Sequence, residues 1–594
     1  MARDRRDAET VDLLVIGSGA AGLATAVTAA ALGMKVLVAE KAAQFGGTSA
    51  WSGGWLWIPH NPLARAAGLA EPPEDPLTYL RHELGEHLDE ARIQAFLENG
   101  HRMISFLREH TAVDFIDGNA IPDFHGRSPG ARTGGRSVCA APFDGRRLGP
   151  HLHRMRPPLD LISFLGMGIA SGADLKHFMN VTRSAASLTH AARRVSRHLA
   201  QRLVHGRGRH LVNGNALVAR LAASALERGV EIRTSAPVRR LLQDARGRVT
   251  GAVLGTSDGA ERPVEALAGV VLACGGFPHD PARLAALIAR QDGNRHWSAA
   301  PPENTGDGLR LGEAAGGQVA CGASPVAWAP VSRVVRADGS VGHFPHLIER
   351  GKPGLIAVTP QGRRFANEAD SYHDLMSALQ AATPPTEPMR AWLVCDHRFI
   401  RRYGLGHVRP APLPLGPALR SGYLRRGATP AALAAACGIE PMVFERTLAD
   451  YNAAARDGLD PAFDRGGTPY NRMQGDAAHP GPNPCVAPIA QAPFYAVEIL
   501  PGSLGTFAGL RTDARARVLA ADLTPIPGLW AVGNDQASVM GGRYPSGGIT
   551  LGPGMTFGFI AAHDAAGRPV GTAPCPLSAP LSVSLSEPSK ELSR

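Results

Sequence analysis

"VDLLVIGSGAAGLATAVTAAALGMKVLVAEK", residues 11–41, decides how this chain folds. An apolar run from Val11 to Ile16 is followed by the glycine pattern GxGxxG, by a helix of small residues and by a second apolar run that ends at Glu40. This order of strand, glycine turn, helix and strand is typical of a Rossmann-like dinucleotide site. We therefore predict an α/β fold in preference to a chance glycine turn.

Each residue of the pattern has a mechanical role in such a site. Gly17 would permit the tight turn, Gly19 would let backbone approach a pyrophosphate at the helix N-terminus, and Gly22 would let helix and strand pack closely. Glu40 would bind ribose hydroxyls. The next stretch, "EKAAQFGGTSAWSGGWLWIP" (40–59), adds a second loop rich in Gly, Ser and Thr, as expected where a long cofactor threads along the domain. We interpret the cofactor as FAD rather than NAD.

Composition sets the broad class. The chain has 594 residues, of which 44% are hydrophobic and 19% charged, so it is expected to be globular, with about two to four domains. No apolar run reaches the roughly 20 residues that cross a bilayer, and the N-terminus is polar, so we expect no transmembrane segment and a cytoplasmic location. The seven cysteines form no CxxC or Cys/His cluster, which argues against a metal site or a disulfide framework.

The formal net charge of +10 is concentrated in residues 183–210, which are rich in Arg and His. No aromatic residues are interleaved with these charges, so the pattern favours a solvated helix face over a nucleic-acid or membrane patch. The sequence alone does not decide whether residues 183–210 contact a membrane.

Four further stretches resemble the fumarate reductase and ketosteroid dehydrogenase superfamily of FAD enzymes. They are "VEIRTSAPVRRLL" (230–242), "VTGAVLG" (249–255), "VVLACGGF" (270–277) and "IPGLWAVGN" (526–534). The resemblance implies a Rossmann-like FAD-binding domain of the GR2 type, assembled from discontinuous segments, with an inserted α+β substrate and catalytic domain.

The expected organisation follows from that placement. Residues 304–317, "NTGDGLRLGEAAGG", would start a helix near the crossing between the domains. We expect the FAD-binding domain in 1–295, with helical insertions in 60–210, the substrate domain in 296–489, the rest of the FAD-binding domain in 490–566, and a disordered tail in 567–594.

Within that superfamily the chain is more similar to the 3-ketosteroid dehydrogenases over most of its length. The similarity is densest in "GRRFANEADSYHDLM" (362–376), in 483–519 and in "GGRYPSGGITLGPGMTFGFIAA" (541–562). It implies that Tyr544 and the backbone N–H of Gly548 hold the substrate's C3 carbonyl oxygen. The alternative for Tyr544 is a residue that caps the turn with its ring in the core.

The resemblance places the base at Tyr372, which would remove a proton next to the carbonyl while hydride goes to flavin N5. His373 or Arg364 could assist this base, although Arg364 and Glu368 could equally form a structural ion pair. The alternative for Tyr372 is a packing residue between the domains. Trp55 and Trp57 are candidates for the pocket lining.

The expected FAD contacts combine the glycine pattern with the resemblance: Gly17, Ser18, Gly19, Ala20, Ala21, Gly22, Glu40, Lys41, Gly46, Gly47, Thr48, Ser49, Val238, Gly275, Gly533, Asn534, Gly548 and Ile549. Succinate dehydrogenases carry covalent FAD on a histidine in the second glycine loop. The loop "GGTSAWSGG" (46–54) has no histidine, so we predict noncovalent FAD.

Two departures from the family pattern concern the bond that is oxidised. Where 1,2-dehydrogenating members carry a tyrosine that assists the base, this chain offers Phe124. The 4,5-dehydrogenating members have a serine two residues after the carbonyl-binding tyrosine, and Ser546 stands there. Both departures favour 4(5α)-dehydrogenation over 1,2-dehydrogenation. The alternative for Ser546 is a hydroxyl that satisfies backbone groups in the turn.

Two other functions compete with a steroid dehydrogenase. A fumarate reductase needs cations for a dicarboxylate, yet this chain has Arg543-Tyr544 in place of an Asn-Arg pair, and Leu504 and Gly505 in place of two histidines. A flavin-bearing carrier without steroid activity would not need both catalytic tyrosines. We expect a hydrophobic, steroid-like substrate, an unidentified electron acceptor and no nucleic acid.

Overall fold

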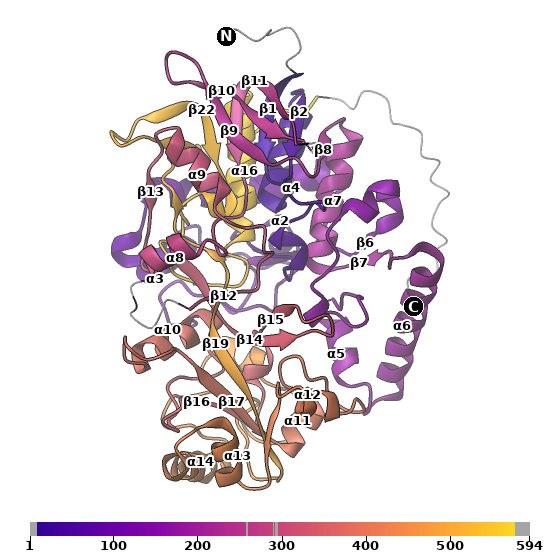
Figure 1. The fold of residues 1–594 in the computed structure, drawn as a ribbon, viewed down its shortest axis with the longest axis vertical. Helices are drawn as coiled ribbons and strands as arrows, with labels where there is room; N and C mark the ends of the chain where they lie inside the picture. The colour runs from indigo at the N-terminus through magenta and orange to yellow at the C-terminus, as the bar shows by residue number, and fades with distance from the viewer. Residues whose placement is uncertain (1–8, 171, 257–258, 289, 291–294, 576–594) are drawn as a thin grey trace.

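In the computed structural model, which describes residues 9–170, 172–256, 259–288, 290 and 295–575, a largely parallel sheet occupies the upper half of Figure 1. Its strands follow the order β21 (Arg517–Leu519), β22 (Pro525–Ala531), β11 (Glu261–Leu272), β1 (Glu9–Ile16), β2 (Val36–Ala39) and β8 (Glu231–Arg233). β1 pairs in parallel with both β2 and β11. The predicted strand, glycine turn, helix and strand are thus confirmed.

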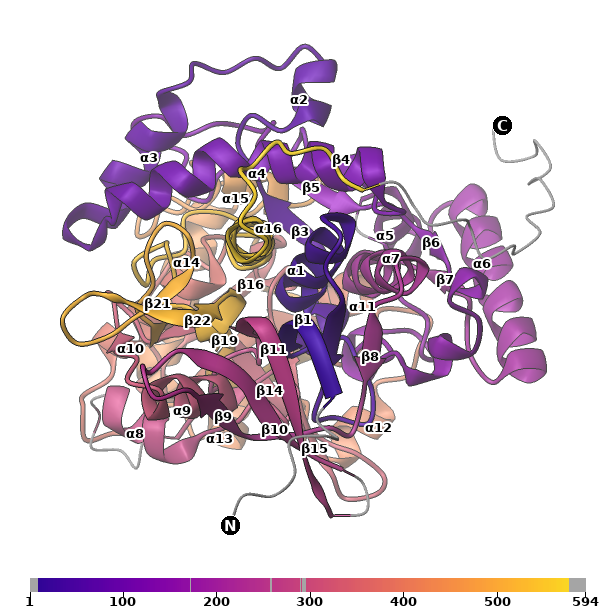
Figure 2. The same ribbon diagram turned by 90° about the horizontal axis from the view of Figure 1, so that it is seen from above.

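One face of this sheet is covered by α1 (Ala20–Ala31), flanked by α7 (Asn213–Glu227) and α16 (Leu551–Ala565) (Figure 2). Gly558 of α16 allows a close approach to α1, because a Cβ at this position would lie 2.7 Å from the Ala21 carbonyl oxygen. The apolar run after the 541–550 glycine turn therefore forms a helix beside the first helix of the chain.

An antiparallel hairpin, β9 (Val238–Gln243) and β10 (Val249–Gly255), extends the sheet from β11. Its second strand has the bounds of the stretch "VTGAVLG". The discontinuous α/β architecture expected from the sequence is confirmed, because β1, β11 and β22 come from three separated parts of the chain.

A second sheet of mainly antiparallel strands lies below the first in Figure 1. Its strand order is β15 (Val341–Pro345), β14 (Val326–Val335), β19 (Phe494–Thr506), β17 (Ala391–Asp396) and β16 (Leu355–Val358), and β12 (Trp297–Ser298) and β18 (Arg425–Gly427) also pair with β19. The predicted C-terminal part of the FAD-binding domain, 490–566, therefore begins with a strand of the second sheet. The chain returns to the first sheet at β21.

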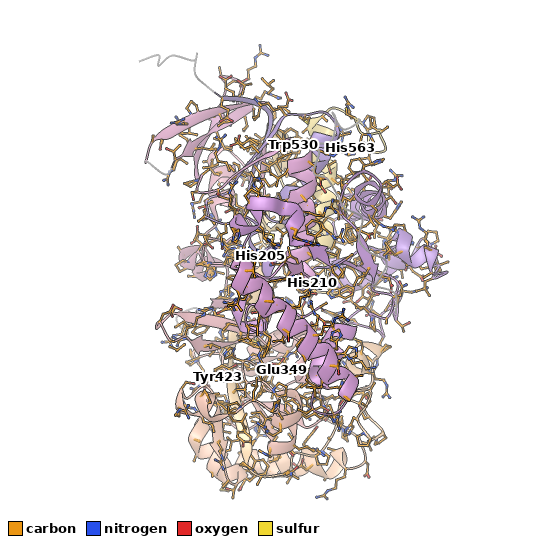
Figure 3. The ribbon with its side chains drawn as sticks, turned by 90° about the vertical axis from the view of Figure 1, so that its right-hand side faces the viewer. His205, His210, Glu349, Tyr423, Trp530 and His563 are labelled. Atoms are coloured by element: carbon orange, nitrogen blue, oxygen red, sulfur yellow. The ribbon has the colours of Figure 1, made fainter. Side chains whose placement is uncertain are left out.

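The region of the expected helical insertions also contains strands of a small sheet, whose order is β3 (Trp55–Trp57), β5 (Ser137–Ala140) and β4 (Phe115–Asp117). The helices of this region are α2 (Pro62–Ala66), α3 (Asp75–Leu84), α4 (Glu90–His110), α5 (Ala173–Met179) and α6 (Ala185–His205), and β6 (Phe143–Asp144) pairs with β7 (His210–Leu211). The helix α6 runs along the outside of the molecule, where Figure 3 faces it.

The other elements connect these layers. They are α8 (Pro281–Leu287), α9 (Asp307–Ala314), α10 (Tyr372–Ala382), α11 (His397–Tyr403), α12 (Gly416–Arg420), α13 (Pro430–Cys437), α14 (Pro441–Ala455), α15 (Pro469–Gln474), β13 (Val319–Ala320) and β20 (Gly509–Leu510). The helix expected within 304–317 is α9. Most of the expected tail, 576–594, lies outside the described residues.

All seven cysteines are free thiols, so the structure contains no disulfide. The ranges described above hold no group of three His, Cys, Asp or Glu residues that could ligate a metal ion. Nor does any described helix have both the length and the apolar character needed to cross a membrane.

Candidate active site

The glycine turn after β1 leaves room for a ligand at the N-terminus of α1. Gly17 has a φ of +106°, and a Cβ there would overlap the carbonyl of Ala273. A Cβ at Gly19 would meet only the Ser49 hydroxyl, at 3.4 Å, so this glycine faces open cavity. Gly19 is also the N-cap, which leaves the positive end of α1 without a side-chain cap from that residue. The turn fits a pyrophosphate.

The Glu40 carboxylate lies beside this turn. It accepts hydrogen bonds from the Ser18 N–H (3.2 Å), the Ser18 hydroxyl (2.5 Å) and the Ala42 N–H (2.9 Å). Lys41 forms an ion pair with Asp307 and donates to the Thr305 hydroxyl (2.8 Å). Glu40 is thus held in the cavity wall, where a carboxylate can accept from a ribose.

The second glycine loop forms the opposite wall. Gly46 and Gly47 have φ values of +116° and +50°, and the Ser49 hydroxyl accepts from the Ala20 N–H (2.9 Å). The amide of Asn304 joins this loop to the end of β11 by donating to Thr48 Oγ1 (2.9 Å) and to the carbonyl of Gly275 (3.1 Å).

A cavity of about 1300 Å³ runs between these loops and continues toward the second sheet. The predicted cofactor residues that line it are Gly17, Ser18, Gly19, Ala20, Ala21, Glu40, Lys41, Gly47, Thr48, Ser49, Val238, Gly275, Gly533, Asn534 and Gly548. Gly22, Gly46 and Ile549 support the wall without lining it. The polar loops, the open helix end and the volume fit FAD.

Asp535 is a residue of this region that the sequence did not single out. Its buried carboxylate accepts from the N–H groups of Cys274 (2.5 Å) and Gly276 (3.0 Å). Burial raises the pKa of Asp535 to about 6, although those two N–H groups oppose the rise. The side chain ties the loop after β11 to the loop after β22, so it fixes the two strand ends that flank the cavity.

Tyr544 and Tyr372 meet at the other end of the cavity. Their ring centroids are 5.0 Å apart with the rings at 79°, and both line the cavity. Burial raises the pKa of Tyr544 to about 12, while hydrogen bonds to Tyr372 and Thr550 oppose the rise. Burial and the neighbouring Tyr544 raise the pKa of Tyr372 well above its ordinary value. Both phenols are protonated at neutral pH.

Gly548 completes this end of the cavity. Its φ is +97°, and a Cβ would lie 2.7 Å from the backbone nitrogen of Trp57, so only glycine fits between the turn and β3. Its carbonyl accepts from the Trp57 N–H (3.2 Å), whereas its own N–H has no acceptor among the described residues. A free N–H beside a phenol can bind a carbonyl oxygen. Trp55 lines the cavity, but Trp57 does not.

Aromatic rings hold the two tyrosines. Phe124 packs on Tyr470 (4.3 Å between centroids), on Tyr544 (5.8 Å) and edge-on against Tyr372 (5.8 Å). The Tyr470 hydroxyl accepts from the Gln474 amide (2.7 Å), and burial raises its pKa. Phe124 was expected near the base, but no pattern in "TPYNRM" pointed to Tyr470.

The start of α10 fixes Tyr372. Ser371 caps the helix through the Asp374 N–H (3.1 Å) and donates to the Asp374 carboxylate (2.6 Å). His125 joins Asp374 (2.8 Å) to Glu83. Burial opposes the charge on His125, but the two carboxylates outweigh it and raise its pKa to about 10. The protonated imidazole therefore holds α10 against α3.

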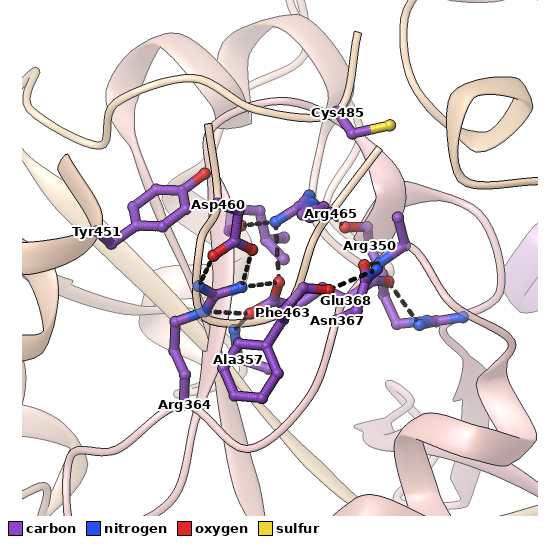
Figure 4. Close-up of polar contacts among 12 residues, drawn as sticks. Arg350, Ala357, Arg364, Asn367, Glu368, Tyr451, Asp460, Phe463, Arg465 and Cys485 are labelled. Carbon is purple, nitrogen blue, oxygen red and sulfur yellow. Dashed lines mark hydrogen bonds and ion pairs between the residues drawn. The ribbon is translucent and has the colours of Figure 1, made fainter. Parts of the chain in front are cut away.

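Neither His373 nor Arg364, the two candidates to assist the base, lines the cavity. The Trp328 N–H donates to His373 Nδ1 (3.2 Å), and burial lowers the pKa of this histidine to about 4, so its basic nitrogen is already engaged. Arg364 pairs with Glu368 and Asp460, each at 2.7 Å, in the buried network of Figure 4. It does not line the cavity, and it forms the structural ion pair that was weighed as its alternative.

Ser546 is buried behind the turn and does not line the cavity. The Ser546 hydroxyl has no hydrogen bond of ordinary geometry among the described residues. It lies near the Asp123 carboxylate. Burial raises the pKa of Asp123, and the Ser546 hydroxyl partly opposes that rise. Asp123 in turn binds Arg136 (2.7 Å) and the indole N–H of Trp57 (2.9 Å).

Comparisons with known proteins cover most of the chain. Residues 12–551 match the family model described as FAD binding domain. The chain is 38% identical, over 93% of each chain, to a 4-oxocyclohex-2-ene-1-carboxylate 5-dehydrogenase of Sinomonas cyclohexanicum, and 34% identical, over 93% of this chain and 97% of the relative, to a 3-oxosteroid 1-dehydrogenase of Mycobacterium tuberculosis.

Among solved structures, the chain resembles the 3-ketosteroid delta1-dehydrogenase from Sterolibacterium denitrificans in complex with 1,4-androstadiene-3,17-dione. The TM-score is 0.85 at 33% identity, and the match covers 94% of this chain and all of that one.

Proposed function

The chain belongs to the FAD-binding family of flavoproteins that includes the 3-oxosteroid dehydrogenases, and we propose that it removes two hydrogens from the carbon–carbon bond next to the carbonyl of a cyclic ketone. It is an FAD-dependent oxidoreductase that acts on CH–CH groups. Bound FAD supplies the hydride acceptor. The residues of the chain bind the ketone, make its α-hydrogen acidic and take that proton.

The pairing of Tyr372 with Tyr544 at one end of the cavity carries this proposal. The Tyr544 hydroxyl and the Gly548 N–H are the donors for the ketone oxygen. Because both donors are fixed before substrate binds, they stabilise the negative charge that develops on the oxygen as the enolate forms. A neutral phenol is required for this role, and burial keeps Tyr544 protonated.

Tyr372 is the group that accepts the α-proton. Burial makes tyrosinate costly, but the buried guanidinium of Arg350 lowers the pKa of Tyr372 against that effect. Arg350 donates only to backbone carbonyls, those of His346, Glu368 and Asp370, and has no carboxylate partner among the described residues. Its positive charge therefore remains available to a tyrosinate nearby.

For a steroid substrate we propose oxidation of the 1,2 bond. The sequence favoured the 4(5α) bond through Ser546, but a hydroxyl behind the turn is poorly placed to move a proton within the cavity. The aromatic cluster of Phe124 and Tyr470 around the base supports a hydrophobic ring substrate. Leu504 in the lining and the exposed Arg543 outside it give no clamp for a small dicarboxylate.

A second candidate substrate is a cyclic ketone that carries a carboxylate, as in the substrate named for the Sinomonas relative. Lys352 and Arg409 line the cavity, and neither has a carboxylate partner among the described residues. Lys352 donates to the carbonyls of Gln474 and Gly475, each at 2.7 Å, and Arg409 to those of Leu161 and Ser163, each at 2.8 Å. Burial lowers the pKa of Lys352, and a carboxylate bound nearby would favour the charged ammonium and oppose that effect.

Flavin bleaching under anaerobic conditions tests both candidates. We would mix the enzyme with androst-4-ene-3,17-dione, 5α-androstane-3,17-dione, 4-oxocyclohexanecarboxylate and the methyl ester of that acid. Bleaching by androst-4-ene-3,17-dione supports 1,2 oxidation, because its 4,5 bond is already unsaturated. Preference for the acid over its ester supports the second candidate, with Lys352→Met expected to abolish that preference. If none of the four bleaches the flavin, the proposed function is wrong.

A further inference from the structure

The turn that carries Tyr544 is tied to the helix α3, none of whose residues lines the cavity. The carbonyl of Pro545 accepts hydrogen bonds from the Tyr79 hydroxyl (2.6 Å) and from the Phe124 N–H (3.0 Å). Tyr79 is fully buried, and its ring centroid lies 5.6 Å from Cζ of the Arg136 guanidinium. A side chain of α3 therefore fixes the backbone of the residue that follows Tyr544.

The same helix is also tied to the start of α10, one turn further along. His125 forms ion pairs with Glu83 of α3 and, at 2.8 Å, with Asp374. Asp374 lies in the first turn of α10, two residues after Tyr372. The hydroxyl of Ser128 also donates to Glu83 (2.6 Å), which fixes this carboxylate. The imidazolium thus connects α3 to the helix that begins at Tyr372.

The two connections are joined to each other. The His125 N–H donates to the Tyr79 hydroxyl (3.4 Å), and the ring of the preceding residue, Phe124, contacts both Tyr372 and Tyr544. We call Tyr79, Glu83 and His125 the α3 bracket. These three residues do not line the cavity, so they do not touch a substrate bound there.

We propose that the α3 bracket consists of positioning residues, which set the distance between Tyr544 and Tyr372 and so between the bound ketone oxygen and the group that takes the α-proton. The proposal rests on the proposed function, because this distance matters only if the two tyrosines have those roles. Tyr372 and Tyr544 are 172 residues apart in sequence, and the bracket gives them a common support.

The charge of His125 is the part of the bracket that is easiest to remove. Without a cation, the carboxylates of Glu83 and Asp374 would face each other unpaired and repel, which would draw the start of α10 away from α3. A displacement of a reacting group by about 1 Å can lower a rate by about 100-fold. Tyr544 would keep its place, because Tyr79 still holds the neighbouring carbonyl.

The test is anaerobic bleaching of the FAD-loaded enzyme by a ketone that bleaches the wild type, either unlabelled or deuterated at the α-carbon. His125→Leu should lower the rate at saturating ketone by about tenfold or more, while the half-saturating ketone concentration stays within about twofold. The α-deuterium isotope effect should increase, because removal of the proton becomes slower than transfer of the hydride. His125→Lys keeps a cation between the carboxylates and should retain most of the wild-type rate.

The matched control is His190→Leu. His190 also pairs with an aspartate, Asp174 (2.7 Å), and its side chain is 35% exposed, against 33% for His125. This variant should keep the wild-type rate and isotope effect. If His125→Leu does not fold with FAD bound, Glu83→Gln weakens the same bridge from α3 and should give the same changes in rate and isotope effect.

A wild-type rate and isotope effect in His125→Leu, or equal rates in His125→Leu and His125→Lys, would overturn the proposal. So would an equal loss of rate in His190→Leu, since that would be a general effect of lost stability. If no ketone bleaches the wild type, the proposed function fails and the positioning role fails with it. Wild-type bleaching that persists in the His125 variants refutes the positioning role alone.

Discussion

Tyr544→Phe isolates the hydroxyl that we assign to the ketone oxygen. The ring keeps its contacts with Phe124, Tyr372 and Phe507, at 5.0–5.8 Å between centroids, so the cavity should retain its shape. The variant loses hydrogen bonds with Tyr372 and Thr550, which costs about 1 kcal/mol of stability each at most. It also loses one of the two donors to the developing enolate, and such a loss typically lowers turnover by about 10²–10³, or roughly 2.7–4 kcal/mol.

The assay is anaerobic stopped-flow bleaching of the bound flavin at saturating ketone. Tyr451→Phe is the matched control, because Tyr451 is also buried and donates one hydrogen bond, to the Ala487 carbonyl (3.2 Å), far from the cavity. It should lose stability but keep the wild-type rate. An unchanged bleaching rate in Tyr544→Phe, with thermal stability reduced as in the control, would refute the carbonyl-binding role and leave Tyr544 as a packing residue.

Four further predictions concern the same site. Tyr372→Phe removes the proton acceptor, so bleaching should fall at least as far as in Tyr544→Phe while equilibrium binding of the ketone, followed by flavin absorbance, persists. In the wild type, the bleaching rate should rise with pH through the alkaline range, because the pKa of Tyr372 lies well above its ordinary value; a rate independent of pH would contradict a tyrosine base. Ser546→Ala should leave oxidation of androst-4-ene-3,17-dione unchanged, and a large loss would revive a role for this hydroxyl in catalysis. Acid precipitation should release all FAD from the wild type, whereas Gly19→Val, which places a side chain where the pyrophosphate fits, should be purified mostly without FAD; flavin retained on the precipitated chain would show a covalent link.

The sequence could predict the nucleotide turn because its parts are local. Gly17, Gly19 and Glu40 lie within one strand–helix–strand unit, and each is constrained by its own backbone or by a neighbour in that unit. The pairing of Tyr372 with Tyr544 joins segments 172 residues apart, and it was expected only through a family resemblance.

Other features depend on packing that no local pattern records. Tyr470 reaches Phe124 from α15, and the cationic lining at Lys352 and Arg409 forms only when two remote loops meet the cavity. The exposure of Leu188, Leu199 and Leu203 on α6 could not be predicted for a similar reason. The spacing of these leucines shows that they share a face of α6. Only the contact of α6 with α5, through Arg194 and Asp174, shows which face of the helix is turned toward the protein.

The position of Tyr372 depends on buried charges outside the cavity. Glu368 binds Arg364 (2.7 Å) and Arg465 (3.1 Å); burial opposes its ionisation, yet the two guanidinium groups keep its pKa low (Figure 4). Arg350 holds the carbonyls of Glu368 (2.8 Å) and Asp370, two residues before Tyr372. Buried ion pairs add little net stability compared with apolar packing, so their use here calls for another reason. One reason is that the guanidinium of Arg350 both fixes the backbone that leads into α10 and lowers the cost of a tyrosinate at its first residue, which an apolar side chain could not do.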